Sequence, residues 1–560
     1  MRPRVSKPRW LWAAVAALIW LLLPAALALA DISGWVVDDS SGEPLAGALV
    51  SVQARPELGT ALTGADGRFT LPLPGLSGAL NLGVAMPYDM DAEHNYLIRL
   101  LQAFDGMEDL QITLFRSPEQ DNPHYLPIPA HWGCNNCHGN YYQQWRQSRH
   151  AGSAVNEWVR DLYSGDGTPG GGAGYVFRNS HDPGDTGFCA ACHAPLQDVL
   201  TPGEVYFDEV SSPAGLDGVT CLACHQIAGV DAANINALHH LGKTQHRFPQ
   251  AHVATEMFVW GPLADVIETP MQAHYSPLHS DPLLCAGCHQ YENPVTGAPG
   301  QATYTEWLAS PYNVDGPERR TCQNCHMEKE AGPGYVGNGG PLRPASQRST
   351  HRFIGATPQR LSENIDLRVT VEQRGAHLVI ATEVENRCGH NFPTGIDIRN
   401  ALLVVDVRLD GQPLPQTRGP VLPFWASDDV PGEQPGDYAG WPGKGYAKVL
   451  EGRINGQGEV VRPVLFIDAE GVHSNTTLPS GHTDHNSFAF ALPLKAAPGT
   501  VAEVDVRLLY RRAWRALAVT KGWTQTPGGM PVEIQVQRHQ QSLPLVPVPD
   551  RLFGDGFDGH

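Results

Sequence analysis

The chain has 560 residues, of which 42% are hydrophobic and 17% charged, and its formal net charge is −19. The length predicts about two to four domains, and the composition excludes an intrinsically disordered chain. The acidity argues against nucleic acid and anionic lipid as partners and favours partner proteins with basic docking patches. The 59 glycines and 47 prolines predict short strands and turns.

Residues 1–30 have the pattern of a secretory signal peptide. A basic segment precedes an apolar run from Trp10 to Ala26, and small residues stand before Asp31. An uncleaved membrane anchor is the alternative, because about 20 apolar residues span a bilayer. Pro24 and the alanine-rich end favour cleavage. We therefore expect a periplasmic or extracellular protein with no stable membrane insertion after cleavage.

Residues 31–118 are expected to form an N-terminal β-sandwich. Residues 32–37 alternate in polarity, and residues 47–52 and 67–71 have strand composition with turn residues between them. The successive patterns Ile-x-Gly-x-Val, Gly-x-Pro-Leu-x-Gly-Ala-x-Val and Asp-Gly-x-Phe resemble the carboxypeptidase regulatory-like β-sandwich. That resemblance implies a structural or adhesive module without catalytic activity.

Five Cys-x-x-Cys-His motifs lie within residues 119–355, where we expect a mostly α-helical and loop-rich domain. This spacing is the attachment signature of c-type haem. The two thiols form thioethers at one edge of the porphyrin, and the following histidine becomes the proximal iron ligand. The five motifs predict five haem c groups. Their residues are Cys134, Cys137 and His138; Cys189, Cys192 and His193; Cys221, Cys224 and His225; Cys285, Cys288 and His289; Cys322, Cys325 and His326.

Two other uses of paired cysteines were weighed against haem attachment. Disulfides are the default in an exported protein, and zinc sites also use cysteine pairs. Neither requires a histidine directly after each pair, and the five motifs consume ten of the eleven cysteines. The remaining cysteine, Cys388, is expected to be a buried free thiol.

A six-coordinate haem iron needs a second ligand, and a buried neutral histidine is the commonest choice. The first candidate is His150, which ends the pattern Tyr142-x-x-Trp145-x-x-Ser148-x-His150, and the spacing puts the first three residues on one helix face. The other candidates are either His274 or His279, then His351, and, with equal weight as a turn residue, His390. Weaker ones are His181, His239, His240, His246 and His252.

The pattern around His150 recurs after the fourth motif as Tyr304-x-x-Trp307-x-x-Ser310-x-Tyr312. Tyr312 therefore stands where the repeat places a ligand. Either this copy has lost its ligand or Tyr312 faces another group. A tyrosine beside a vacant iron position could donate protons, which is the sequence's one indication of catalysis.

Residues of about 120–355 resemble the multihaem cytochromes of the cytochrome c-554 type. The resemblance rests on the segment ending at His150, on Gly218-Val-Thr-Cys221, and on Met327 directly after the fifth motif. It implies a helical, loop-rich fold around stacked haems, two histidine ligands on most irons, and a role in electron transfer. Distant relatives of that type oxidise or reduce small nitrogen and sulfur compounds.

Residues 356–545 are expected to form a C-terminal β-sandwich-like domain, because short strands of alternating polarity return after a linker. The segment Gly389-His390-x-x-Pro393-Thr-Gly395 resembles one in β-domains that follow haem regions in related cytochromes. Residues 546–560 are acidic and glycine-rich and predict a disordered tail.

Two functions follow from these patterns. The first is an exported electron-transfer protein with five haem c groups, mostly with two histidine ligands, that exchanges electrons with redox partner proteins. The second is a multihaem oxidoreductase with one open iron that acts on a small nitrogen or sulfur compound. The flanking β-domains suggest an additional docking role. The sequence gives no indication of an oligomeric state.

Overall fold

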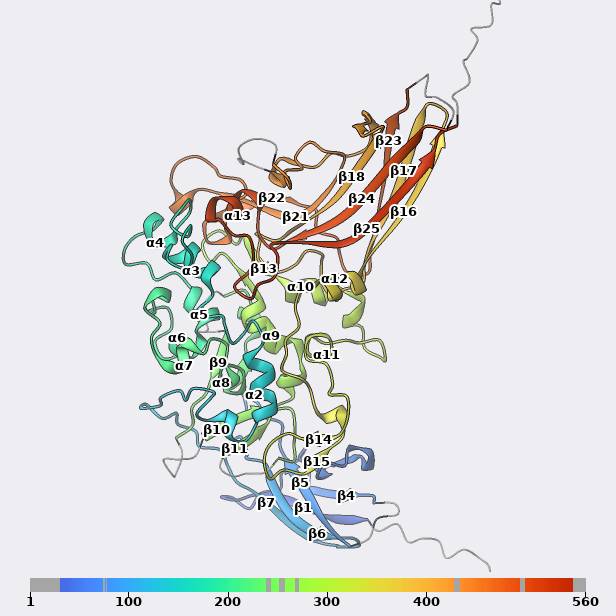
Figure 1. Ribbon diagram of the computed structural model, residues 1–560. Coiled ribbons are helices and arrows are strands. Elements are labelled where there is room, and N and C mark those ends of the chain that lie inside the picture. Colours follow the sequence, from blue (N-terminus) through green and yellow to red (C-terminus); the bar gives the residue numbers. More distant parts are fainter. Residues whose placement is uncertain are drawn as a thin grey trace, which may run out of the picture. The chain divides into compact units, whose positions relative to one another are not determined.

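The computed structural model describes residues 31–73, 76, 78–237, 243–250, 257–266, 271–427, 434–493 and 499–546 (Figure 1). The chain divides into two compact units. The first takes residues up to Gln120 together with 249–276 and 340–344, and the second takes 121–248, 277–339 and everything from Ala345 onward. The second unit therefore combines all five motifs with the C-terminal β-domain. The proposed signal peptide and the end of the chain from residue 547 lie outside the described residues.

The first unit contains a three-stranded and a four-stranded sheet that share one hydrophobic core. The core is built from the alternating apolar positions of the strands, such as Ile32 and Val36, Val50 and Val52. One sheet has the order β4 (Arg68–Leu71), β1 (Ile32–Asp38), β7 (Leu110–Leu114), and the other has the order β3 (Thr60–Leu62), β2 (Leu49–Val52), β5 (Ala79–Ala85), β6 (Arg99–Phe104).

Two segments from the middle of the sequence complete this first unit. The parallel strands β10 (Met257–Gly261) and β11 (Met271–Tyr275) lie in it, and the amide of Ile98 donates to the carbonyl of Ala273 at 3.0 Å. Between the strands, the Asp265 carboxylate accepts the amide of Ala54 at 2.7 Å and pairs with Arg343 at 2.9 Å. Sequence analysis assigned these segments to the haem region, so that region is interrupted twice.

The motif-bearing part of the second unit is made of short helices, single 3₁₀ turns and two-stranded sheets, because glycine and proline break up longer elements. Its α-helices are α2 (Gly139–Arg146), α3 (Glu157–Tyr163), α4 (Phe177–Ser180), α5 (Cys189–His193), α6 (Pro195–Asp198), α7 (Pro213–Leu216), α8 (Cys221–His225), α9 (Pro282–His289), α10 (Thr303–Leu308) and α11 (Cys322–His326). Its small sheets pair β8 (Ile227–Val230) with β9 (Thr244–His246) and β12 (Gln290–Glu292) with β13 (Pro299–Ala302), and it also contains β14 (Gly334–Tyr335). Strand β15 (Leu342–Arg343) falls in the first unit.

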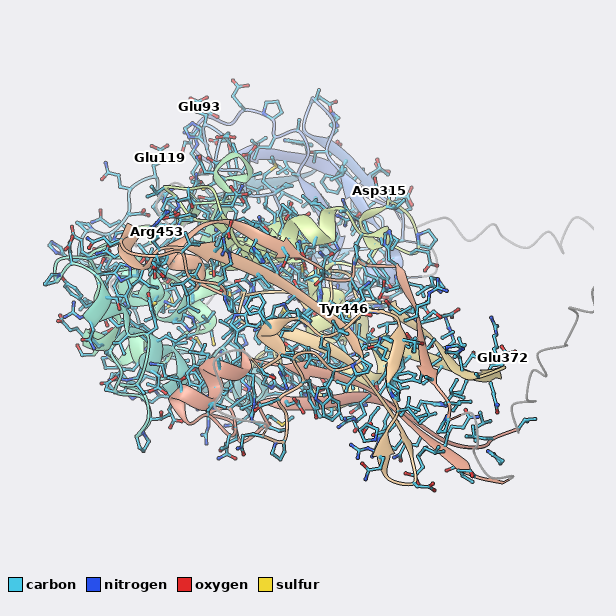
Figure 2. The ribbon with its side chains drawn as sticks, turned by 90° about the horizontal axis from the view of Figure 1, so that it is seen from above. Glu93, Glu119, Asp315, Glu372, Tyr446 and Arg453 are labelled. Carbon is cyan, nitrogen blue, oxygen red and sulfur yellow. The ribbon has the colours of Figure 1, made fainter. Side chains whose placement is uncertain are left out.

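After α12 (Pro358–Asn364), two larger sheets pack face to face over a common core. The first has the order β16 (Ile365–Arg374), β17 (His377–Asn386), β23 (Thr483–Ala491), β20 (Gln416–Arg418). The second has the order β22 (Ala469–Asn475), β21 (Gly443–Gly452), β18 (Asn400–Leu409), β24 (Val501–Arg511), β25 (Glu533–Pro544), with β19 (Gln412–Pro413) beside β18. Tyr446 lies in this core and donates from its hydroxyl to Asp484 at 2.8 Å (Figure 2).

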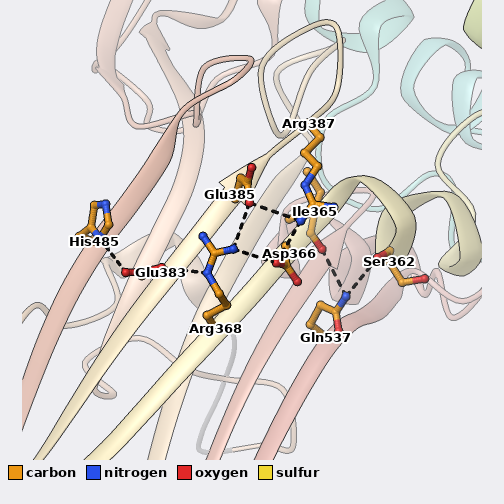
Figure 3. Close-up of polar contacts among 9 residues, drawn as sticks. All are labelled: Ser362, Ile365, Asp366, Arg368, Glu383, Glu385, Arg387, His485 and Gln537. Atoms are coloured by element: carbon orange, nitrogen blue, oxygen red, sulfur yellow. Dashed lines mark hydrogen bonds and ion pairs between the residues drawn. The ribbon is translucent and has the colours of Figure 1, made fainter.

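The outer face of the first sheet carries a network of ion pairs (Figure 3). Arg368 on β16 reaches Glu383 at 2.9 Å and Glu385 at 3.3 Å on β17, and Arg387 shares Glu385 and Asp366. The alternation of buried and exposed residues along both strands places these charges in solvent and the apolar residues in the core.

The second sheet is buried on its other face as well. Strand β18 is almost wholly apolar and buried, and Leu402 and Val404 on it pack with Trp425, Trp514 and Trp523. Trp523 also lies parallel to Trp158 of α3, with ring centres 4.3 Å apart. The C-terminal β-domain is therefore packed directly on the motif-bearing region.

α13 (Arg515–Lys521) ends in a buried lysine that binds the motif-bearing region. The ammonium of Lys521 donates to the carbonyls of Asp161, Gly171 and Tyr175 at 3.0, 2.6 and 2.7 Å. Three carbonyl acceptors satisfy all three donors of the ammonium, which is why this cation can be buried.

Candidate haem-binding site

Each of the five motifs is wound into a single helical turn. The first begins in the 3₁₀ turn η2 (Cys134–Asn136), and the others lie on α5, α8, α11 and the end of α9. A helical turn brings residues three and four apart to the same side, so the two thiols and the histidine of a motif face one way. Covalent attachment of a haem requires this arrangement, because both thiols must reach one edge of the porphyrin and the histidine must reach the iron.

Thiols of different motifs contact one another. The thiol of Cys134 is hydrogen-bonded to that of Cys221, and this contact with burial raises the pKa of Cys134. Cys192 and Cys288 form a second such pair, and Cys285 and Cys322 a third. The contacts connect the first motif with the third, the second with the fourth, and the fourth with the fifth.

Several candidate ligands are held through Nδ1, which leaves Nε2 available. Nδ1 of His138 lies 2.8 Å from the carbonyl of Val336, and Nδ1 of His326 lies 2.7 Å from that of Ile354. His351 and His390 have the same kind of contact with backbone carbonyls, at 3.2 and 2.9 Å. A carbonyl acceptor places the proton on Nδ1 and fixes the tautomer that binds metal through Nε2.

Proximal and distal candidates face each other in pairs. Two imidazoles on opposite sides of one iron have ring centres about 6 Å apart, since each metal–nitrogen bond is about 2 Å long and each nitrogen lies about 1 Å from its ring centre. The rings of His326 and His390 are 6.4 Å apart with 16° between their planes. The rings of His289 and His150 are also 6.4 Å apart, at 49°. Both pairs fit one iron each.

The proximal histidine of the third motif has two such neighbours. The ring of His225 lies 6.3 Å from that of His351 and 5.5 Å from that of His279. Nε2 of His279 contacts the carbonyl of Cys224 at 3.1 Å, whereas His351 makes its polar contact through Nδ1. His351 is therefore better oriented toward the third iron in this structure.

Burial keeps these imidazoles neutral. It lowers the pKa of His150, His351 and His390 to about 4 and that of His289 to about 3, with smaller contributions from neighbouring positive charges. Only a neutral imidazole has the lone pair that binds a metal. Nδ1 of His150 and of His193 is buried without a hydrogen-bond partner among the described residues.

His274 belongs to the first unit, whereas the five motifs belong to the second. Nε2 of its ring contacts the hydroxyl of Ser117 at 2.8 Å, and the ring packs parallel to Trp260 at 4.6 Å. Because Nε2 is engaged in both His274 and His279, these contacts leave the choice between the two as open as the sequence did.

The weaker candidates divide into two groups. Both ring nitrogens of His181 are engaged, by the carbonyl of Phe177 and by Asp468 at 3.0 Å, so this histidine is a hydrogen-bonded core residue. Nε2 of His246 contacts the carbonyl of Ala223 at 3.0 Å. His239, His240 and His252 lie outside the described residues.

The internal repeat has a structural role at a later motif in each case, the third for the first copy and the fifth for the second. The indole of Trp145 on α2 donates to the carbonyl of Val219 at 2.7 Å, and that of Trp307 on α10 donates to Arg320 at 2.8 Å. Each acceptor stands two residues before a motif, Cys221 in the first case and Cys322 in the second. The repeated tryptophan thus braces the attachment turn of the third motif in the first copy and that of the fifth motif in the second.

Tyr312 and Cys388 make contacts that explain them without an iron. The hydroxyl of Tyr312 donates to the carbonyl of Arg387 at 2.8 Å, so it ties the repeat to the β-domain. Burial raises the pKa of the Cys388 thiol to about 12, so the thiol is protonated at neutral pH. The described structure gives neither residue a catalytic contact.

The donor set fits five haem c groups. Ten thiols outside disulfides in five turns, each followed by an imidazole, are what covalent haem attachment uses. Sequence reasoning missed three residues that shape the site: Gln301, whose amide lies 2.9 Å from Nδ1 of His289, Phe353 beside His150, and Gly337, where a Cβ would lie 2.9 Å from the His138 ring. None of the three lies in a motif, so the sequence carried no signal for them.

The comparisons with known proteins add little to this geometry. No family model matches the sequence. No curated protein matches it. Among solved structures, the chain is similar to a penta-heme cytochrome c552 from Thermochromatium tepidum, with 20% sequence identity and a TM-score of 0.49, over 74% of this chain and 99% of that chain. The assignments below rest on the motifs and their geometry.

Proposed function

We propose that this chain is an exported electron-transfer protein that carries five covalently attached haem c groups. The observation that carries the proposal is the set of five Cys-x-x-Cys-His turns whose thiols contact one another across motifs. When bound, a haem supplies a one-electron redox centre. Attachment points in contact hold neighbouring porphyrin edges close together, as electron transfer requires.

The contacts between motifs define the proposed sequence of centres. Motifs one and three, two and four, and four and five are joined by thiol pairs. Cys224 also influences Cys285, which brings the third and fourth motifs together. The motifs thereby form one continuous path with the second as a branch at the fourth.

The fifth motif is the proposed point of exchange with a partner. Cys325 is the exposed one among the ten motif cysteines, and the others are buried or partly buried. An attachment edge at the surface shortens the distance to a docked redox protein. Because the chain is strongly acidic, we propose partners with basic docking patches.

Haem content and spin state test the proposal. The mature protein should give five haems per chain in the pyridine haemochrome assay and a mass with five covalent additions. Replacing the Cys322 and Cys325 pair by alanine should leave four, whereas Cys388→Ala, the control, should keep five. A count other than five in the unaltered protein would contradict the assignment.

Electron paramagnetic resonance separates the electron carrier from the enzyme. If the protein is an electron carrier, its oxidised form should give only low-spin haem signals. Nitrite, hydroxylamine and sulfite should leave those signals unchanged. A high-spin fraction near one haem in five that responds to one of these would favour an oxidoreductase with an open iron. No described helix is both long and apolar enough to cross a membrane.

A further inference from the structure

Four ionisable side chains gather where the β-domain packs on the fourth and fifth motifs. Asp397 and Arg399 follow the His390 turn, Lys448 lies on β21, and Glu306 lies on α10. Asp397 is 2% exposed and Lys448 is 9% exposed. Burying this many charges is costly unless they are paired or can change protonation state.

Asp397 is the least satisfied member of the cluster. Neither of its carboxylate oxygens has a hydrogen-bond partner among the described residues. Burial raises its pKa to about 7, against the opposing charge of Lys448 and nearby backbone amides of Asp397 itself and Phe466. The other titratable group near it is the buried phenol of Tyr291 on β12, whose pKa is raised by burial and by the Asp397 charge.

Lys448 stands between the two acids. Its ammonium donates to the carbonyl of Gly300 at 2.9 Å, and the charges of Asp397 and Glu306 partly offset the lowering of its pKa by burial. Glu306 accepts the hydroxyl of Thr394 at 2.5 Å and the amide of Asn391 at 3.2 Å, and burial raises its pKa.

The cluster adjoins two of the proposed haem sites. Gly300, which Lys448 binds, precedes Gln301, whose amide contacts the proximal His289. Asn391, which Glu306 binds, follows the distal candidate His390. The positive charge of Arg399 lowers the pKa of both histidines, so it acts on both sites.

A small cavity connects the cluster with the protein surface. It has a volume of about 10 Å³ and is lined by residues that include Glu306, Arg399, Lys448 and the exposed Asn475. A cavity of this size with several polar neighbours holds about one water molecule. It offers a proton a route from solvent to Glu306 and Lys448, the two partners of Asp397 in the cluster.

We propose that Asp397, with Glu306 and Lys448 beside it, is a proton-binding site that takes up a proton when the chain accepts an electron at the His289 and His390 sites. The inference rests on the proposed function. One electron arrives from a reductant or redox partner, and one proton from solvent binds the Asp397 carboxylate to give the neutral acid. On oxidation, both leave.

The sign of the coupling follows from charge. Adding an electron near a buried carboxylate makes its negative form less favourable, so the carboxyl gains a proton on reduction. By linkage, protonation of the carboxyl favours reduction, and the midpoint potential of the coupled site falls as pH rises. Asp397 is half-protonated near pH 7, so the dependence is expected between about pH 6 and pH 8.

Redox titration of the full-length holoprotein with dithionite and ferricyanide at several pH values tests the proposal. In the unaltered protein, the midpoint potential of at least one haem should fall as pH rises from 6 to 8, and Asp397→Asn should reduce that fall. Asp315→Asn, which removes the same charge from a fully exposed position, is the control and should keep it (Figure 2).

Infrared difference spectra between the reduced and oxidised forms decide the identity of the group. Protein labelled with ¹³C-aspartate should show a shifted carbonyl band of a protonated carboxyl on reduction, and Asp397→Asn should remove it. If the variant fails to fold, the labelled, unaltered protein still shows whether an aspartate gains a proton on reduction.

Absence of an aspartate band in the unaltered protein, or its persistence in Asp397→Asn, would overturn the inference. If the proposed function itself is wrong, the result is a different one: a chain without haem would show no redox-dependent change in its visible spectrum at any pH.

Discussion

At the scale of single residues, the histidines are distinguished by which ring nitrogen is occupied. His390 contacts a backbone carbonyl through Nδ1 and faces His326 at 6.4 Å, whereas His274 and His181 have Nε2 engaged by Ser117 and Asp468. A ligand needs a free nitrogen that points at the metal. The direction of each ring therefore separates ligand candidates from core histidines of equal burial.

Removal of one distal candidate tests this distinction. His390→Ala should leave five haems attached but convert one of them from low spin to high spin, because its iron loses one axial ligand. Electron paramagnetic resonance of the oxidised protein measures the fraction. His482→Ala, at an exposed position in the same domain, should keep every haem low spin.

An unchanged spectrum in His390→Ala would show that another group binds the fifth iron. In that case, the 6.4 Å separation from His326 would reflect packing alone.

The covalent ligands are a prediction that can be made from the sequence alone, whereas the distal candidates can be narrowed only with the fold. A Cys-x-x-Cys-His motif is local, so its chemistry can be read from five adjacent residues. The partner of His326 lies 64 residues away on a turn of another domain, where only folding brings it near. His274 belongs to the first unit because of a chain excursion that no local pattern signals.

At the scale of elements, the repeated helices α2 and α10 brace the third and the fifth motif respectively. Trp145 and Trp307 each donate a hydrogen bond to the carbonyl two residues before an attachment turn. The sequence revealed the repeat as a stripe of aromatic residues, but not the acceptors, because these are backbone groups 74 and 13 residues away.

Loss of the indole donor should destabilise the brace. Trp145→Phe keeps most of the ring but leaves the Val219 carbonyl without its donor, which costs about 1–3 kcal/mol. A fall in the unfolding midpoint by the corresponding amount is the expected result. Trp132→Phe, whose ring is 64% exposed, should change the midpoint little. Equal effects of both substitutions would contradict the brace.

Loss of the buried Lys521 ammonium should destabilise the fold more than loss of one indole donor, because three hydrogen bonds depend on it. Lys521→Met keeps the aliphatic stem but leaves the carbonyls of Asp161, Gly171 and Tyr175 without their donor. We expect a loss of about 3 kcal/mol or more in the free energy of unfolding. Lys329→Met, at an exposed position, is the control. Denaturant titration of both variants measures the difference, and a loss below about 1 kcal/mol would mean that water replaces the ammonium.

At the scale of the whole molecule, the cluster around Asp397 makes stability depend on pH. The folded pKa of about 7 lies above the ordinary value of 3.8. Between those values the folded chain keeps a proton that the unfolded chain has released, so this group lowers stability as pH rises from about 4 to about 7. The contribution amounts to about 2–4 kcal/mol across the window.

Asp397→Asn should therefore flatten the fall in stability between pH 4 and pH 7. Unfolding midpoints of the oxidised protein at pH 5 and pH 7.5 provide the comparison, with Asp315→Asn again as the matched control. A variant whose midpoint falls as steeply as that of the unaltered protein would show that Asp397 does not carry this dependence.

The two β-domains could be predicted as strand-rich regions because apolar and polar residues alternate along them. The packing of the C-terminal domain against the motif-bearing region could not, because it depends on the second apolar face of β18 and on Trp523 meeting Trp158. The signal peptide, the domain boundaries and the carboxypeptidase regulatory-like resemblance stay predictions.

The interrupted course of the first unit has a consequence for how the protein is made. Its core strands begin at Ile32, but the ion pair of Asp265 with Arg343 closes only after residue 343 has been synthesised. By then, all five motif segments have been synthesised. The earliest segment of the chain therefore completes its fold only after every motif-bearing segment has been made.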